Sequence, residues 1–365
     1  TGPLRGRHPW VFSQAITNIP EGLEPGEPVR VESESGAYLG TGYFSSYSQI
    51  AVRLWGYEEN ENVDKDFFKK RIEKAYEIRR NYIEDEGTDS YRLINGENDL
   101  LPGLIVDKYA SFLVLQCHTK GISKWKAQII DSLVEVLNPD GIYERSETSR
   151  HLKDNPGFSG LLSGDVPDIV TIKENGFRFL VDVKKGQKTG FFLDQRDKRN
   201  AVRRYSKGKS VLNCFSYTGA FSVYALSGGA EKAVCVDTSQ DALALARENI
   251  KLNGLDLSKC NFVSEDVKKY LRGVSRGTFD LIMLDPPAFI KDRKKKAEGL
   301  VGYKGINESA LSALPEGGIL VTSSCSAHLT LQEFRYLLSE AGGRTRKTVR
   351  ILETFQHGAD HPVLA

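Results

Sequence analysis

The chain has 365 residues, which is too many for one ordinary hydrophobic core and predicts two or three domains. Its 50 basic and 48 acidic residues give a formal net charge of +2, so any surface that binds a polyanion must be a local one. The five cysteines are odd in number, widely spaced and without a C-x-x-C pair, which argues against a disulfide framework and against a zinc site.

The polar residues Thr1 to His8 lack the apolar segment of a signal peptide. No later apolar stretch is long enough to cross a bilayer, and the cysteine usage is typical of a reducing compartment. We therefore expect a soluble, cytoplasmic protein with no metal and no membrane partner.

The first 62 residues contain short β-type runs separated by Gly, Pro and Ser, at 10–12, 28–31, 38–44 and 50–55. Regularly spaced short strands of this kind predict a small β-barrel-like module over residues 1–62. Basic and aromatic side chains alternate at Arg7, His8 and Trp10, a combination that suits RNA. The alternative is that Trp10 and Phe12 are simply core residues.

Helical spacing of apolar residues between Phe68 and Ile83 predicts an amphipathic helix after Asp64, and so a domain boundary near residue 62. We expect strands at 104–106, 112–115 and 142–143 and a helix from about Ser123 to Leu137. Residues 63–168 are therefore predicted to form an α+β domain. Its polar segment from Glu144 to Phe158 is expected to be a solvated loop, with an RNA contact as the alternative.

The segment Lys173-Glu174-Asn175-Gly176 separates two β-type runs. Its Asn-Gly pair is the strongest short signal for a hairpin. Residues 169–183 are therefore predicted to form a hairpin that links the middle domain to a C-terminal domain of residues 184–365.

From Lys209 strand and helix patterns alternate, which predicts an α/β fold with a doubly wound parallel sheet. A strand at 211–215 leads through the turn Ser216 to Gly219 into a helix. Gly219 allows close approach of the backbone to a ligand, and the helix N-terminus offers free N–H groups. Because one glycine stands where a dinucleotide fingerprint has three, a smaller, cationic nucleoside cofactor is favoured over a pyrophosphate.

Acidic residues follow the next strands of this predicted sheet. Asp237 follows a strand at 233–236 and is placed to accept hydrogen bonds from both ribose hydroxyls. Asp266 ends a third strand, 262–266, and is placed to accept a bond from an adenine amino group. With Gly219 and Asp285, these acids favour S-adenosylmethionine over a nucleotide of another class.

Two further strands end in reactive groups. Asp285-Pro286-Pro287 follows the apolar run 281–284, and Ser323 to Ser326, which includes Cys325, follows the run 319–322. Ligands of open α/β sheets bind outside the carboxyl ends of the strands, so neighbouring strands would turn this acid and this thiol toward one crevice. The pair suits attack on cytosine, with the thiolate adding to carbon 6 while the carboxyl group protonates or hydrogen-bonds nitrogen 3. A structural cysteine and an ordinary strand-ending turn are the alternative.

Several motifs together carry a resemblance to a known family. They are Arg7 to Phe12, Gly190 to Arg196, Asn213 to Gly219, Val236 to Ser239, Asp285 to Pro287, Gly302 to Lys304 and Ser324 to Ser326. Over nearly its full length the chain resembles the bacterial 23S ribosomal RNA cytosine-5 methyltransferases of the three-domain type. The resemblance implies an N-terminal PUA domain, a middle α+β domain and a C-terminal class I methyltransferase domain with a Rossmann-like sheet.

The resemblance also implies roles for single residues. Cys325 is the nucleophile, assisted by Asp285, and the segment from Phe192 to Arg196 helps to enclose the cofactor. The implied contacts to S-adenosylmethionine are Phe192, Asp194, Gln195, Arg196, Asn213, Phe215, Tyr217, Thr218, Gly219, Asp237, Thr238, Ser239, Asp266 and Asp285. Asn213 departs from the family pattern, because many class I methyltransferases have an acid there.

The expected partner is 23S ribosomal RNA, and a homodimer is compatible with the sequence. The expected RNA contacts are Arg7, His8, Trp10, Lys291, Arg293, Lys294, Tyr303 and Lys304, with Phe289 or Tyr303 available to stack on an extruded base. For the basic run Lys291 to Lys296, a solvated charged face is the alternative. The chain begins abruptly and stops before the last antiparallel strand that the resemblance implies, so we expect the natural chain to extend beyond both ends.

Other functions remain open at this point. A guanine-N7 ribosomal RNA methyltransferase of related build would need no nucleophilic cysteine. An RNA-binding assembly factor with a vestigial methyltransferase site would not need to bind S-adenosylmethionine. A small-molecule or protein methyltransferase fits poorly with the barrel-like N-terminal module.

Overall fold

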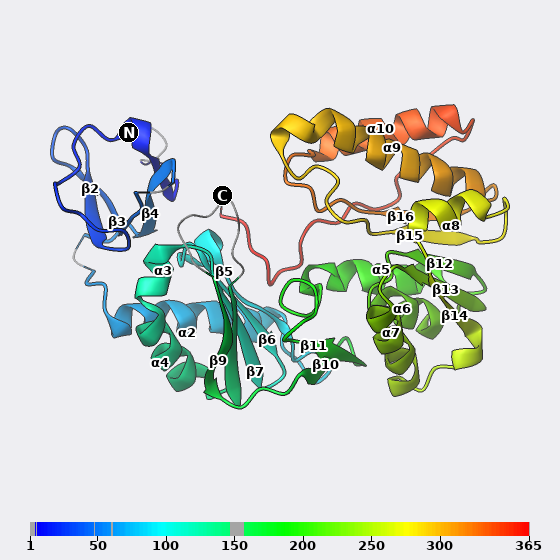
Figure 1. Ribbon diagram of the computed structural model, residues 1–365, viewed down its shortest axis with the longest axis horizontal. Coiled ribbons are helices and arrows are strands. Elements are labelled where there is room, and N and C mark those ends of the chain that lie inside the picture. Colours follow the sequence, from blue (N-terminus) through cyan, green and yellow to red (C-terminus); the bar gives the residue numbers. More distant parts are fainter. Residues whose placement is uncertain (1–3, 5, 47, 60, 147–156, 365) are drawn as a thin grey trace. The chain divides into compact units, whose positions relative to one another are not determined.

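The computed structural model describes residues 4, 6–46, 48–59, 61–146 and 157–364, and Figure 1 shows its ribbon. Close contacts divide the chain into two compact units. The first consists of residues 1–177, 181–195 and 357–365, and the second of residues 178–180 and 196–356. No helix in the described part of the chain is both long enough and apolar enough to span a membrane.

The first unit begins with an antiparallel sheet of four strands in the order β1-β4-β3-β2. Its elements are β1 (Trp10–Phe12), η1 (Ser13–Ala15), β2 (Pro28–Glu32), β3 (Tyr38–Phe44) and β4 (Ile50–Gly56). All four predicted strands are confirmed. No pairing joins β1 to β2 among residues 6–46 and 48–59, so the described sheet is open. Phe12 is 45% exposed, so the interpretation of Phe12 as a core residue is wrong.

Side chains from this sheet share a core with the elements that follow. Tyr43 and Trp55 are fully buried, and the Trp55 ring lies 5.8 Å from Phe67 and 6.0 Å from Trp125. The Tyr43 hydroxyl donates to the carbonyl oxygen of Pro102 at 3.0 Å. One continuous core therefore contains residues from both sides of the predicted domain boundary at residue 62.

The rest of the first unit contains a five-stranded sheet in the order β5-β6-β7-β8-β9, with α2 and α4 packed against each other. Its elements are α2 (Lys65–Tyr82), β5 (Tyr91–Asn95), η2 (Gly96–Asp99), β6 (Leu104–Tyr109), β7 (Phe112–Cys117), α3 (Lys120–Lys124), α4 (Lys126–Leu137), β8 (Gly141–Ser146) and β9 (Phe158–Gly164). The helix predicted after Asp64 is confirmed: the Asp64 side chain caps α2 by accepting from the N–H of Phe67.

The prediction of a solvated loop from Glu144 to Phe158 is wrong at both ends, because Glu144 to Ser146 lie in β8 and Phe158 lies in β9. Glu144 is 1% exposed and forms an ion pair with Lys126 at 2.6 Å. The sequence pattern did not predict this part of the strand, because a buried, paired carboxylate cannot be told from a solvated loop residue by its charge alone. Of the basic residues that give this segment its alternative of an RNA contact, Arg145 lies in β8, and Arg150, His151 and Lys153 lie outside the described residues.

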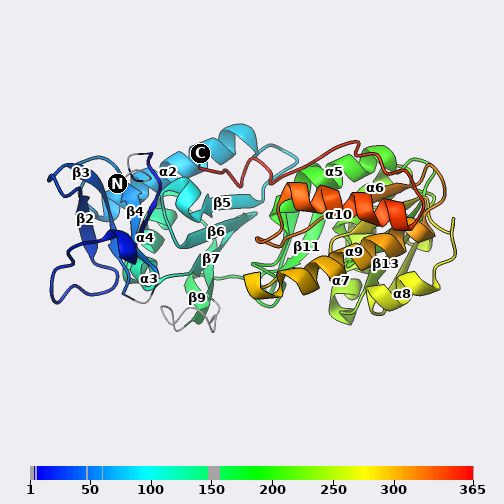
Figure 2. The same ribbon diagram turned by 90° about the horizontal axis from the view of Figure 1, so that it is seen from above.

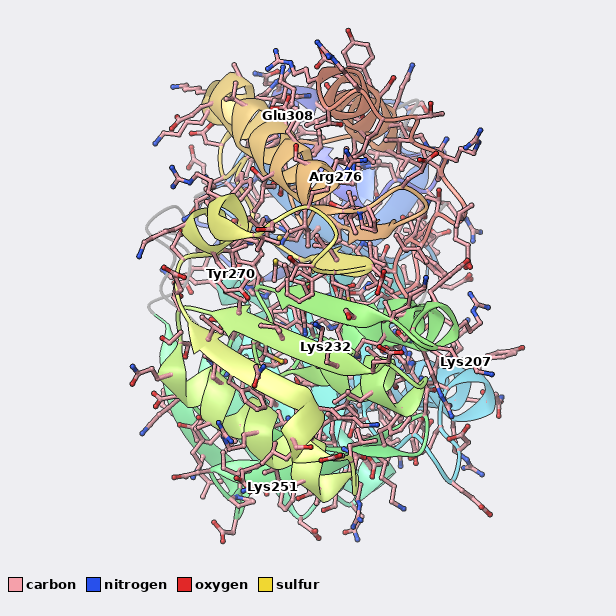
Figure 3. The ribbon with its side chains drawn as sticks, turned by 90° about the vertical axis from the view of Figure 1, so that its right-hand side faces the viewer. Lys207, Lys232, Lys251, Tyr270, Arg276 and Glu308 are labelled. Atoms are coloured by element: carbon pink, nitrogen blue, oxygen red, sulfur yellow. The ribbon has the colours of Figure 1, made fainter. Side chains whose placement is uncertain are left out.

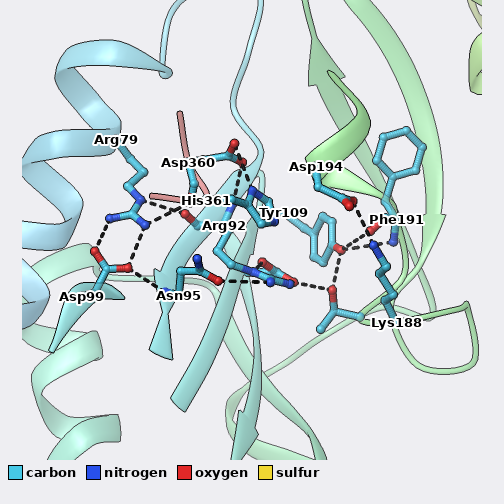
Figure 4. A network of polar contacts seen from close by, with 12 residues as sticks. Arg79, Arg92, Asn95, Asp99, Tyr109, Lys188, Phe191, Asp194, Asp360 and His361 are labelled. Carbon is cyan, nitrogen blue, oxygen red and sulfur yellow. Dashed lines mark hydrogen bonds and ion pairs between the residues drawn. The ribbon is translucent and has the colours of Figure 1, made fainter. Parts of the chain in front are cut away.

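The C-terminal residues of the first unit run beside α2 and β5 (Figure 2), and a buried polar network holds them there (Figure 4). Arg79 forms a two-bond ion pair with Asp99, at 2.6 and 2.8 Å, and also donates to the carbonyl oxygen of Asp360 at 3.0 Å. The carboxylate of Asp360 accepts from the backbone N–H of Arg92 at 3.1 Å. Residues around Asp360 are therefore held by backbone and side-chain bonds together.

The same network continues to the segment that precedes Phe192 (Figure 4). Asp107 pairs with Arg92 at 2.8 Å and accepts from the Thr189 hydroxyl at 2.5 Å. The Tyr109 hydroxyl accepts from the N–H of Phe191 at 3.1 Å, and burial raises the pKa of Tyr109, so the phenol stays protonated. This segment is thereby fixed onto β6.

A hairpin of β10 (Ile169–Glu174) and β11 (Phe177–Asp182) follows, and its tip confirms the prediction from the Asn-Gly pair. Asn175 and Gly176 both have positive φ, at 49° and 83°, as a type I′ turn requires.

The second unit is a doubly wound α/β sheet of five parallel strands in the order β14-β13-β12-β15-β16, as predicted. Its strands are β12 (Ser210–Cys214), β13 (Lys232–Asp237), β14 (Cys260–Ser264), β15 (Leu281–Leu284) and β16 (Ile319–Thr322). The helices are α5 (Arg196–Tyr205), α6 (Ala220–Ser227), α7 (Gln240–Leu252), η4 (Leu257–Lys259), α8 (Val267–Gly273), η5 (Arg293–Lys295), α9 (Lys296–Ala313) and α10 (Leu331–Arg344), and η3 (Leu193–Gln195) lies before them in the first unit.

Helices α5, α6 and α7 cover one face of this sheet, and α8, α9 and α10 cover the other (Figure 1). Both faces are therefore buried, which explains why β15 is apolar and buried at every position. Lys207, Lys232 and Arg276, labelled in Figure 3, lie at or just before the starts of β12, β13 and β15. The candidate site lies at the opposite, carboxyl ends of these strands.

Candidate active site

Strand β12 lies between β13 and β15, so the chain reverses its direction of winding at this strand. Ligands of open α/β sheets bind at such a switch point, outside the carboxyl ends of the strands. Gly219 follows β12, Asp237 ends β13 and Asp285 follows β15, so the sheet brings these three predicted residues to one edge.

The turn after β12 is an unusual piece of backbone. Phe215 and Tyr217 have positive φ angles of 58° and 47°, and Gly219 has one of 74°. A Cβ atom on Gly219 would lie 2.7 Å from the Cβ of Ala246 in α7. Glycine is therefore needed here for its left-handed backbone and for the packing of α7, in addition to the predicted approach of a ligand.

Asp237 fastens this turn to the start of α7. Its two carboxylate oxygens accept from the backbone N–H groups of Tyr217 and Ser239, each at 2.9 Å. A carboxylate oxygen has two lone pairs, so each retains one for a further donor such as a ribose hydroxyl. The arrangement fits the predicted role of Asp237.

Some of the polar side chains near this turn are already hydrogen-bonded within the protein, and others are not. Asn213 is 1% exposed and donates from Nδ2 to the Ser222 hydroxyl of α6 at 3.0 Å, so its contact to the cofactor stays a prediction. The Thr218 hydroxyl is buried and has no hydrogen-bond partner within the described part of the chain. An unsatisfied buried hydroxyl in this turn fits a ligand with hydrogen-bonding groups. Thr238 is exposed, and the Ser239 side chain caps α7.

The prediction of a strand over 262–266 is wrong at its end, because β14 stops at Ser264. Asp266 is the N-cap of α8, and its side chain accepts from the N–H of Lys269 at 2.9 Å. Asp266 is exposed, so its carboxylate remains open to a further donor. Its contact to adenine stays a prediction.

Asp285 and Cys325 follow neighbouring strands, as the crevice predicted from the sequence requires. Strands β15 and β16 pair in parallel with Leu284 opposite Thr322. The Ser323 hydroxyl donates to the carboxylate of Asp285, and the Cys325 thiol donates to the carbonyl oxygen of Pro286 at 3.8 Å. Cys325 is exposed, whereas the other four cysteines are buried. The interpretation of Cys325 as a buried structural residue is therefore wrong.

Three hydroxyl groups that the sequence pattern did not predict to meet lie together around this thiol, and we call them the hydroxyl cluster: Tyr303, Ser324 and Ser326. Tyr303 is fully buried, and its hydroxyl bonds to both serine hydroxyls, at 2.9 Å to Ser324 and 2.8 Å to Ser326. The sequence signal was the pair of serines flanking Cys325. Because Tyr303 is fully buried, its ring offers no exposed face to a base, and the predicted RNA contact of Tyr303 is wrong.

Residues of the Gly190 to Arg196 motif fall on both sides of the division between units. Phe192, Asp194 and Gln195 belong to the first unit, where Lys188 pairs with Asp194 at 2.9 Å and lies 4.4 Å from the Phe192 ring. Arg196 is buried and begins α5 in the second unit. Their enclosure of the cofactor stays a prediction.

The predicted RNA contacts are likewise spread over the chain. Lys291, Arg293 and Lys294 are exposed around η5, which follows β15. Lys304 faces α10, with its ammonium 3.5 Å from Glu340. In the first unit, the Trp10 indole donates to Glu97 at 2.9 Å and the Arg7 guanidinium lies 5.4 Å from the Tyr57 ring. For all of these, with His8, RNA contact stays a prediction.

Two family models match segments of the chain. A model of S-adenosylmethionine-dependent methyltransferases matches residues 146–356, and a PUA-like domain matches residues 2–56. Proteins named ribosomal RNA large subunit methyltransferase I from Escherichia coli O139:H28 and from Cronobacter sakazakii are each 43% identical over 366 residues, covering 99% of this chain and 92% of the relative.

Solved structures agree. A protein from Streptococcus mutans described as a SAM-dependent methyltransferase is 26% identical, with a TM-score of 0.84 over 99% of this chain and 93% of that one. A protein described as a methyltransferase and solved with SAH superposes with a TM-score of 0.85, at 26% identity over 100% of this chain and 93% of that one. SAH is S-adenosylmethionine without its methyl group. The family model and this solved structure therefore both indicate S-adenosylmethionine as the cofactor.

Proposed function

The chain belongs to the S-adenosylmethionine-dependent methyltransferase family, and we propose that it methylates carbon 5 of a cytosine in 23S ribosomal RNA through a covalent bond to Cys325. One observation carries the proposal: an exposed thiol lies at the carboxyl end of β16, hydrogen-bonded to the loop that follows Asp285 on the neighbouring strand. Relatives named ribosomal RNA large subunit methyltransferase support the class of substrate. An RNA substrate of this class implies action in the cytoplasm.

The two side chains have distinct tasks in the proposed reaction. Carbon 5 of cytosine is a weak nucleophile, and addition to carbon 6 makes it a strong one. The Cys325 thiolate forms a bond to carbon 6, while Asp285 hydrogen-bonds or protonates nitrogen 3, where the displaced electron pair gathers. S-adenosylmethionine, when bound, supplies an electrophilic methyl group to carbon 5. A base in the same crevice, a water molecule or a side chain, then takes the proton from carbon 5; the electron pair of that C–H bond restores the 5,6 double bond, and the thiolate leaves carbon 6.

A stacked base hides both carbons, so the target nucleotide must be extruded into the site. The half-buried Phe289 stands four residues after Asp285, and Lys268 lies 5.0 Å from its ring. Since Tyr303 is fully buried, we assign the stacking of the base to Phe289.

Asp237 is expected to dominate binding of the cofactor's ribose, because a charge-assisted hydrogen bond is worth about 1.5–3 kcal/mol. Asp237→Asn keeps the shape but replaces one accepting oxygen by a donor. We expect the Kd for S-adenosylhomocysteine to rise about 10–100-fold, measured by isothermal titration calorimetry. The matched control is Asp241→Asn, an exposed acid in the first turn of α7. An unchanged Kd for Asp237→Asn would remove Asp237 from the ribose site.

The proposed chemistry is tested with 23S RNA transcribed with 5-fluorocytosine, which traps the adduct because fluorine cannot leave carbon 5 as a proton would. With S-adenosylmethionine present, a denaturing gel should show a slow-migrating protein–RNA species for the wild-type chain and none for Cys325→Ala. Methyl transfer from labelled cofactor without any adduct would refute the cytosine assignment and favour the guanine-N7 alternative. No transfer and no cofactor binding would favour an assembly factor.

A further inference from the structure

We propose that Tyr303 is a positioning residue, which holds the loop of Cys325 in the geometry needed for attack on the base. The inference rests on the proposed function, because the position of this loop matters to the rate only if Cys325 is the nucleophile.

The phenol oxygen of Tyr303 forms hydrogen bonds with both chain neighbours of Cys325. Ser324, which precedes Cys325, donates to it at 2.9 Å, and Ser326, which follows Cys325, lies 2.8 Å from it. One buried oxygen atom thus fixes both chain neighbours of the reactive residue, and the exposed Cys325 side chain projects from a segment tied down at each end.

Further bonds join this segment to the loop after Asp285. The Ser326 hydroxyl accepts from the N–H of Ile290 at 3.2 Å, and Ser323 donates to the Asp285 carboxylate. The N–H of Phe289 donates to the Tyr303 hydroxyl at 3.4 Å. The phenol therefore links the loop that holds the thiol to the loop that holds the acid and the proposed stacking ring.

Helix α9 is shaped to bring Tyr303 to this point. A Cβ atom on Gly299 would lie 2.3 Å from Ile290, and one on Gly302 would lie 3.3 Å from the Phe289 ring. The helix can approach the loop this closely because both positions lack a side chain. The Tyr303 ring then packs 4.7 Å from Phe289 and 6.1 Å from Phe334, within a small buried cluster of its own.

A phenol in this place is better explained by positioning than by packing alone. Phenylalanine would fill the same apolar cluster without requiring hydrogen-bond partners, and a buried hydroxyl is tolerated only when it is satisfied. Catalysis requires the attacking atom to be held close to its target, and an error of about 1 Å can cost about 100-fold in rate. The hydroxyl cluster provides this restraint without touching the substrate.

The test is Tyr303→Phe, which removes one oxygen atom and keeps the ring. In single-turnover experiments at saturating 5-fluorocytosine RNA and S-adenosylmethionine, we expect the rate of adduct formation to fall about 10–100-fold. The Kd values for RNA and for S-adenosylhomocysteine should stay within about twofold, because the phenol contacts neither. The matched control is Tyr336→Phe, which removes a hydroxyl from the exposed face of α10 and should change nothing.

Hydrogen exchange supplies a measurement that does not depend on RNA. In Tyr303→Phe, amide exchange of residues 288–292 and 323–328 should be faster, while that of the cofactor turn at 213–219 stays as in the wild-type chain. A wild-type adduct rate in Tyr303→Phe, even with a lowered melting temperature, would make Tyr303 merely structural and overturn the proposal. If the wild-type chain forms no adduct at all, the proposed function fails instead, and unchanged exchange would then also overturn the restraint on the loop.

Discussion

Cys325→Ala should lower the single-turnover rate of methyl transfer at least about 1,000-fold, a loss of about 4 kcal/mol of transition-state stabilisation. The reason is that carbon 5 has no other means of activation once the thiol is gone. Neither S-adenosylhomocysteine affinity nor RNA affinity should change by more than about twofold, since the thiol binds neither tightly. The rate is measured with labelled cofactor and unmodified 23S RNA, under conditions in which each enzyme molecule reacts once.

Two controls make this result specific to the thiol. His328→Ala alters another exposed residue of the same segment and should retain the wild-type rate. Cys325→Ser keeps the size and a hydroxyl donor for the Pro286 carbonyl but should be as slow as Cys325→Ala, because a serine hydroxyl is a far weaker nucleophile near neutral pH. Transfer by Cys325→Ala within about tenfold of the wild-type rate would contradict the covalent route.

That Asp285 and Cys325 lie at the same edge of the sheet could be predicted, because it depends only on local sequence patterns and one general rule. Each residue follows a short apolar run, and the carboxyl ends of parallel strands meet at one edge. The role of Tyr303 could not be predicted in this way. Its contacts to Ser324 and Ser326 bring together residues more than 20 positions apart, and its burial depends on two glycines that let α9 approach.

Elsewhere, strands with a clear apolar pattern were predicted and strands without one were not. Strands β15 and β16 are almost entirely apolar and were predicted with their observed bounds, whereas β14, with the sequence CNFVS and only one buried residue, was predicted at shifted bounds. Strands β5 and β9 were missed, since β9 has small residues and exposed side chains, including Leu161 at 50% exposure. Gly219 was found, but its packing against Ala246 of α7 was not, because no local pattern shows which helix a turn will meet.

The shared core of the first unit changes how RNA binding by the N-terminal sheet should be tested. Removing residues 1–62 would delete Tyr43 and Trp55, which are fully buried against α2 and its neighbours. Loss of activity in such a truncated chain would then report on unfolding as much as on RNA. Single changes at exposed residues, such as Arg7 and His8, separate the two effects.

The largest effect on stability is expected in the first unit, at Arg79. Its guanidinium is fully buried and donates to Asp99 and to the carbonyl oxygens of Arg92 and Asp360. Arg79→Met keeps a long, helix-favouring side chain but leaves the buried Asp99 carboxylate, 3% exposed, without its cation. Breaking a buried pair from one side costs about 3–5 kcal/mol, so we expect the free energy of unfolding of this unit to fall by that amount.

Tryptophan fluorescence isolates this effect, because Trp10, Trp55 and Trp125 all belong to the first unit. Urea unfolding followed at the tryptophans should therefore shift strongly to lower urea concentration for Arg79→Met. The matched control is Arg80→Met, the exposed next residue of α2, for which a change within about 0.5 kcal/mol is expected. Equal changes in the free energy of unfolding for the two variants would mean that the network around Asp99 adds little to stability. Residues 357–364 would then be held by something other than the bond from Arg79 to Asp360.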